Sequence, residues 1–118
     1  MLIVDAHEDI AYNALRYNRD YTTSALDIRT TEINSKSVID NGLACLGHDE
    51  WLSGHVGIIF ATLFSPPYSH YSGDSEKMYY RNSEQAHQLA HNQLDYYLNL
   101  EQKGGFQIIR NRKDLDIV

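Results

Sequence analysis

A histidine and two carboxylates follow directly after the first apolar run of the chain. The run at residues 2–4 leads into the segment Asp-Ala-His-Glu-Asp at residues 5–9. Alternate residues of a strand point to the same side, so His7 and Asp9 project together if the extended backbone continues that far, while Glu8 points away. Imidazole and carboxylate groups are common ligands of zinc and similar divalent ions. The spacing therefore predicts metal ligands at His7 and Asp9, and a turn with a helix cap is the alternative interpretation.

Further side chains that could bind a metal ion or contact a substrate lie later in the chain. His87 and His91 are four residues apart in a helical pattern and have the spacing of a chelate, but we interpret them as the solvated flank of that helix. Tyr68, His70 and Tyr71 lie in a loop that follows an apolar strand. For these three residues, contact with a substrate and packing in an ordinary surface loop both stay open.

Composition and charge limit the classes of function. The chain has 118 residues, which corresponds to one domain or a piece of a larger one, and its net charge is −6. That charge, with no cluster of lysine and arginine, argues against a nucleic-acid partner. No signal-peptide pattern is present, and no apolar run approaches the ~20 residues that span a bilayer. The single cysteine, Cys45, excludes an internal disulfide and favours a cytoplasmic location.

The remaining elements alternate between strand and helix. Apolar runs predict a strand at about residues 2–6, a second at about 56–64 and the beginning of a third at 106–109. A helical region follows the first strand, and an apolar stripe predicts a long helix at about residues 83–103. This order predicts an α/β fold with parallel strands.

So few parallel strands cannot protect both faces and both edges of a sheet. An exposed edge beside the apolar strand at 56–64 would promote association with other chains. We therefore expect this chain either to be a fragment of a barrel or to be completed by copies of itself.

Three blocks of the sequence resemble the membrane (renal) dipeptidase family, peptidase family M19. Residues 5–9 match the family's opening motif, a strand running into Asp-x-His-x-Asp. Residues 51–60 resemble its second block, with a leucine, a glycine and a strand that has Val-Gly near its start. Residues 83–118 resemble its outer helix and the approach to its third strand. An aspartate at position 9, where related amidohydrolases usually carry a second histidine, distinguishes this family.

The resemblance implies that the chain, residues 1–118, is a single N-terminal fragment, about the first third of a (β/α)8 TIM-type barrel. Such a barrel holds two zinc ions and hydrolyses dipeptides through a metal-bound hydroxide. His7 and Asp9 would be ligands of one zinc. A bridging glutamate, two histidines and an aspartate near the attacking water would come from later strands, so no catalytic residue is expected within residues 1–118.

Two side chains alone hold at most one ion weakly. We therefore expect weak zinc binding and no measurable dipeptidase turnover from this chain by itself. Two alternatives stay open. One is another barrel metallohydrolase, acting on amides, lactones or phosphoesters, which would share His7 and Asp9. The other is a catalytically inactive fragment that self-associates through its exposed sheet edges.

Overall fold

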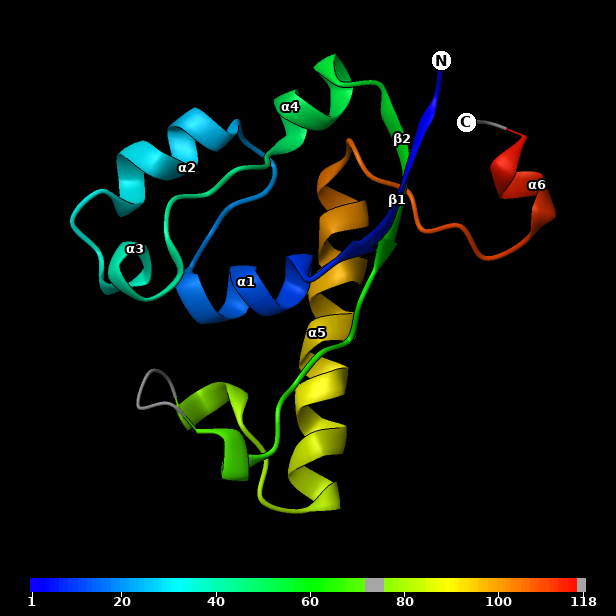
Figure 1. Ribbon diagram of the computed structural model, residues 1–118. Helices are drawn as coiled ribbons and strands as arrows, with labels where there is room; N and C mark the ends of the chain where they lie inside the picture. The colour runs from blue at the N-terminus through cyan, green and yellow to red at the C-terminus, as the bar shows by residue number, and fades with distance from the viewer. Residues whose placement is uncertain (72–75, 117–118) are drawn as a thin grey trace.

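Two parallel strands and one long helix form the frame of the computed structural model, which describes residues 1–71 and 76–116 (Figure 1). The helices between the two strands, α1 to α4, lie to one side of this frame, and α6 lies on the other side. In chain order the elements are β1 (Ile3–Glu8), α1 (Ile10–Tyr17), α2 (Ala25–Glu32), α3 (Lys36–Asn41), α4 (His48–Ser53), β2 (Val56–Ala61), the short 3-10 turns η1 (Tyr68–His70) and η2 (Glu76–Met78), α5 (Ser83–Lys103) and α6 (Arg112–Leu115).

The strands β1 and β2 pair in parallel, so their carboxyl ends lie at the same edge. Ile3 pairs with Val56 at one end of the ladder, and Glu8 pairs with Ala61 at the other. The register is irregular between Asp5 and Glu8. The extended backbone nevertheless continues to Glu8, beyond the range expected from the apolar residues alone. His7 therefore belongs to the strand, and the chain turns into α1 directly after Asp9.

The long helix α5 spans the range that its apolar stripe predicts. The side chain of Asn82 caps its first turn by accepting a hydrogen bond of 2.9 Å from the backbone N–H of Gln85. It ends at Gly104, whose φ of 89° suits a residue without a Cβ atom. Helix α1 packs beside the middle of α5 (Figure 1). No helix within residues 1–71 and 76–116 is long and apolar enough to cross a membrane.

The core lies where α1, α2 and α4 meet β2 and α5. Its centre is a cluster of buried side chains that includes Trp51, and β2 contributes the half-buried Val56 and Ile59 to it. The buried members of this cluster are Ile10, Ala14, Tyr21, Ile28, Ala44 and Trp51. Because the aromatic ring of Trp51 is enclosed here, it acts as a packing residue.

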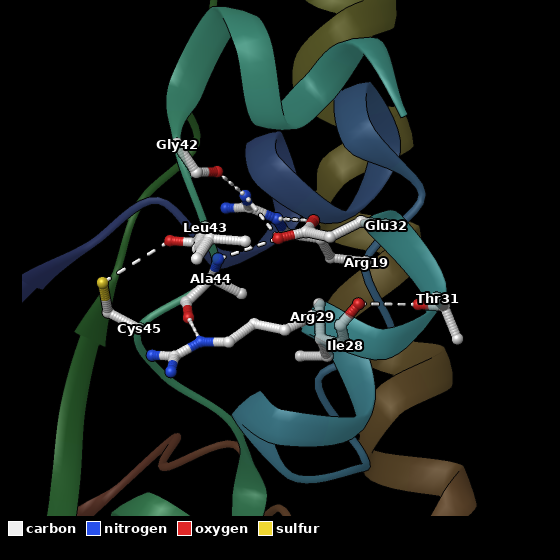
Figure 2. A network of polar contacts seen from close by, with 9 residues as sticks. All are labelled: Arg19, Ile28, Arg29, Thr31, Glu32, Gly42, Leu43, Ala44 and Cys45. Carbon is white, nitrogen blue, oxygen red and sulfur yellow. Dashed lines mark hydrogen bonds and ion pairs between the residues drawn. The ribbon is translucent and has the colours of Figure 1, made fainter. Parts of the chain in front are cut away.

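A buried ion pair joins the segments around α2 and α3 (Figure 2). Arg19 Nε donates to Glu32 Oε2 at 2.8 Å, and both side chains are about 95% shielded from solvent, with exposed fractions of 5% and 4%. Arg19 Nη2 also donates to the carbonyl of Gly42, and the backbone N–H of Ala44 donates to Glu32 Oε1, each at 2.8 Å. The neighbouring Cys45 is exposed, and its thiol adds nothing to this buried network.

The prediction of the first third of a (β/α)8 barrel is wrong. In the part of the chain that the structure describes, only β1 and β2 form a sheet, and no repeated strand-helix units follow. Four helices separate β1 from β2 where a barrel unit has one. The third strand expected at 106–109 does not form, because the backbone N–H of Ile108 donates to Glu101 Oε1 at 2.8 Å instead of to a neighbouring strand.

Candidate metal site

His7 and Asp9 lie close together at the carboxyl end of β1. The imidazole Nε2 of His7 is 3.5 Å from Asp9 Oδ1. The His7 side chain is 72% exposed and the Asp9 side chain 32% exposed, so both groups are accessible from solvent. The strand geometry therefore brings together the two residues that the sequence singled out, with one imidazole and one carboxylate directed at each other.

Asp9 is held by the end of the second strand. Thr62, directly after β2, donates its hydroxyl to Asp9 Oδ1, and its backbone N–H donates to the carbonyl of Glu8 at 3.0 Å. The side chain of Asp9 makes no hydrogen bond to the first turn of α1, although Asp9 occupies the N-cap position. Its carboxylate is thus turned toward Thr62 and His7, which differs from the helix cap that the sequence also allowed.

Tyr97 of α5 ties the end of β2 and the first turn of α1 to the long helix. Its hydroxyl donates to the carbonyl of Thr62 at 2.9 Å and accepts from the backbone N–H of Ala11 at 3.1 Å. Burial raises the pKa of the Tyr97 hydroxyl, so this group stays a neutral hydrogen-bonding bridge. The position of Asp9 therefore depends on β2 and α5 as well as on its own strand.

Carboxylates make this edge of the sheet electronegative. Burial, followed by the neighbouring charges of Asp5 and Asp9, raises the pKa of Glu8 to about 7. Asp5 accepts a 3.0 Å hydrogen bond from the backbone N–H of His7, so it orders the backbone of the candidate ligand. A cation placed at this edge would relieve the repulsion among these groups.

The described residues provide two donors for such a cation. Within residues 1–71 and 76–116 there is no group of three or more histidine, cysteine, aspartate or glutamate side chains able to hold a metal ion. Zinc in a catalytic site ordinarily has three protein ligands and one open position. His7 and Asp9 therefore fit part of a zinc ligand set and leave at least two positions open.

The other residues considered from sequence do not join this site through any contact that the structure shows. His55 lies directly before β2 with a φ of 59°, and its Nδ1 lies 3.1 Å from the carbonyl of Ser53. Tyr68 and Tyr71 stack on each other with ring centroids 5.0 Å apart, and the guanidinium of Arg81 lies over the Tyr68 ring. These aromatic side chains pack within their own loop.

Thr62 and Tyr97 were missed in the sequence. The sequence could have indicated Thr62, because it is the first polar residue after β2 and the carboxyl ends of parallel strands lie at one edge of a sheet. Tyr97 had none, since it sits in the apolar stripe of α5 and its sequence position does not show where the hydroxyl points.

Comparison of the chain with protein-family models, with curated proteins and with solved structures finds no match. The likeness to peptidase family M19 accordingly stays a prediction from the motif residues.

Proposed function

We propose that this chain contributes His7 and Asp9 as two zinc ligands to a metal-dependent dipeptidase. The observation that carries the proposal is the 3.5 Å approach of His7 Nε2 to Asp9 Oδ1 at the shared carboxyl edge of two parallel strands. Imidazole and carboxylate are the donor types that catalytic zinc sites use. The exposed cysteine and the lack of an internal disulfide support a cytoplasmic location for this activity.

The chain's own residues would act by positioning. Thr62 fixes the Asp9 carboxylate, Asp5 fixes the backbone at His7, and Tyr97 ties the end of β2 and the first turn of α1 to α5. Zinc, when bound, lowers the pKa of a water molecule and polarises the peptide carbonyl of the dipeptide. Because two donors hold an ion weakly, hydrolysis needs further ligands from outside the described residues, including those for a second zinc.

Zinc titration with dipeptide hydrolysis measured alongside tests the proposal. We expect the purified chain to bind Zn²⁺ weakly, with no dipeptidase turnover, and His7→Ala or Asp9→Ala to weaken the binding at this site at least about tenfold. His55→Ala is the matched control, because it removes an exposed imidazole that has no contact with Asp9. In a His87→Ala background, which lacks the other histidine pair with chelate spacing, zinc binding that is indifferent to both His7→Ala and Asp9→Ala would contradict the proposal. Turnover that is lost in His7→Ala would show instead that this chain is sufficient for catalysis.

The same two ligands would serve a metallohydrolase that acts on amides, lactones or phosphoesters. Zinc chemistry at a carbonyl or phosphoryl centre is similar, so His7 and Asp9 do not distinguish these substrates. Assays on a dipeptide, a lactone and a phosphoester separate the classes once the remaining zinc ligands are supplied to this chain, and the dipeptide is then the substrate expected to be hydrolysed.

Self-association is a second candidate, favoured by the apolar surface of the strands. Ile3 and Val4 of β1 and Phe60 of β2 are all exposed, and neither strand has a further pairing partner within the described residues. Light scattering of the wild type should then show a mass above that of one chain, and Val4→Lys should restore the monomer. A monomeric wild type would exclude this role without affecting the zinc proposal.

A further inference from the structure

A second pair of metal-ligand side chains lies on α5, apart from His7 and Asp9. His87 and His91 are one helical turn apart, and both are exposed. Their ring centroids are 4.4 Å apart, with the planes at 68°. Side chains four residues apart on a helix are neighbours, so the helix itself brings these two imidazoles together at its exposed surface.

The ring separation matches what one shared ion requires. A zinc–nitrogen bond of about 2.0–2.1 Å places the ion about 3.2 Å from the centre of each imidazole ring. Two such ligands at an angle between about 90° and 109° then have ring centroids about 4.5–5.2 Å apart. The observed 4.4 Å lies just below this range, so the rings must move slightly apart, by a small rotation of the side chains, to share an ion. The same spacing on a helix, with histidines at i and i+4, presents two imidazoles to one zinc ion in known metal-binding motifs.

The helix holds the two histidines in place on its open side. Gln93 is fully buried on the opposite side of α5, where its Oε1 accepts from the backbone N–H of Phe64 at 2.9 Å and its Nε2 donates to the Phe64 carbonyl at 2.7 Å. Tyr97, on that side as well, bonds to Thr62. These anchors fix the rotation of α5, so the His87 and His91 side chains face solvent with the backbone already ordered. Binding an ion therefore needs no folding of the backbone, and the two side chains lose rotamer freedom as they close on the ion.

We propose that His87 and His91 chelate one divalent transition-metal ion, such as Zn²⁺, Cu²⁺ or Ni²⁺, on the exposed side of α5. Imidazole nitrogen suits these ions, whereas Mg²⁺ and Ca²⁺ prefer oxygen ligands. Water completes the coordination. This site shares no residue with His7 and Asp9, so the two proposals stand or fall separately.

Calorimetric titration of the His7→Ala chain with Zn²⁺ isolates this site from the one on β1. We expect one bound ion, with no heat of binding for Mg²⁺. Adding His87→Ala or His91→Ala should weaken Zn²⁺ binding at least about tenfold, since losing even an outer partner of a ligating histidine costs about 10- to 100-fold. Alanine on the exposed side of a helix preserves the fold, which circular dichroism checks.

A register change provides the matched control. His91→Ala combined with Asn92→His keeps the number of histidines but puts the second imidazole five residues from His87, on a different side of the helix. This variant should lose the binding, whereas His55→Ala should retain it. The proposal is overturned if the His7→Ala chain binds no Zn²⁺, or if the register variant binds it as tightly as its parent.

Discussion

Glu8 is the side chain whose charge this fold disfavours most clearly. Its folded-state pKa is about 7, against 4.5 for an ordinary glutamate, because of burial and the nearby charges of Asp5 and Asp9, with His7 acting in the opposite direction. Between these two values the unfolded chain ionises Glu8 while the folded chain keeps it protonated. The stability that the protonated Glu8 gives to the folded chain is therefore fully present below pH 4.5, the pKa of Glu8 in the unfolded chain. It is lost as the pH rises through about 7, the pKa of Glu8 in the folded chain.

Glu8→Gln removes this pH dependence. At about pH 8 it should raise the free energy of unfolding by about 1–2 kcal/mol, less than the full shift implies because Glu8 is only half-buried. At about pH 4, where the carboxyl is protonated in both states, the change should be close to zero. Urea unfolding at the two pH values measures this, with the exposed Asp95→Asn as control. An equal effect at both pH values would contradict the assigned cause.

At the scale of single residues, sequence spacing predicted the pairing of His7 with Asp9 because strand periodicity is local. It could not predict the state of Glu8. The sequence places Glu8 on the opposite side of the strand from His7, whereas the irregular register after Asp5 leaves the Glu8 carboxyl in contact with that of Asp5.

At the scale of elements, the buried amide of Gln93 fixes α5 to the segment after β2, in addition to the bridge that Tyr97 makes to Thr62. Gln93 satisfies both backbone groups of Phe64 and also donates to the hydroxyl of Ser65 at 3.0 Å. Without the amide, the Phe64 groups would lose their partners in a half-buried place, where an unmet hydrogen bond is costly.

Gln93→Leu, which keeps a similar volume, should lower the free energy of unfolding by about 1–3 kcal/mol. The exposed Gln88→Leu on the same helix should change it by no more than about 0.5 kcal/mol. Thermal or urea unfolding measures the free energy of unfolding of the two variants. Equal values would show that Gln93 does not anchor α5.

The elements with strong local patterns were predictable, and those that depend on partners were not. The continuous apolar run of β2 predicts a strand from its own residues, and the N-cap and apolar stripe of α5 predict a helix in the same way. Residues 106–109 have an apolar character that suits a strand, but Glu101 accepts the N–H of Ile108 and bonds the guanidinium of Arg110 at 2.7 Å. Glu101 belongs to the preceding helix α5 and takes the place of a neighbouring strand as the partner of Ile108. The apolar pattern at 106–109 does not show which of the two partners is bound.

At the scale of the whole molecule, the buried Arg19–Glu32 pair holds together the segments before α2, at its end and after α3. A lone charge left in such a place is far more costly than the pair itself. The sequence shows Arg19 and Glu32 as ordinary polar residues, so neither the pair nor the packing of α2 and α3 could be predicted from it. The barrel expectation failed at this same scale, because it assumed a repeat of strand and helix that α1 to α4 do not follow.

Arg19→Met should lower the free energy of unfolding by about 3–5 kcal/mol, since Glu32 would remain buried without its partner. Adding Glu32→Leu should recover part of the loss, so that the double variant is less destabilised than the sum of the two single variants. Urea midpoints of the four proteins measure this coupling, with Arg112→Met as an exposed control. Additive losses would show that the two charges act independently.

The central claim is that His7 and Asp9 share a cation at the carboxyl edge of β1 and β2. The most direct measurement is a Zn²⁺ titration followed by the imidazole nitrogen signals in NMR spectra, assigned through His7→Ala and compared with the Asp9→Ala chain. We expect the His7 signals to shift with added zinc and Asp9→Ala to suppress this shift, while the His55 signals stay unchanged. His7 signals that do not respond to zinc, or respond equally without Asp9, would contradict the claim.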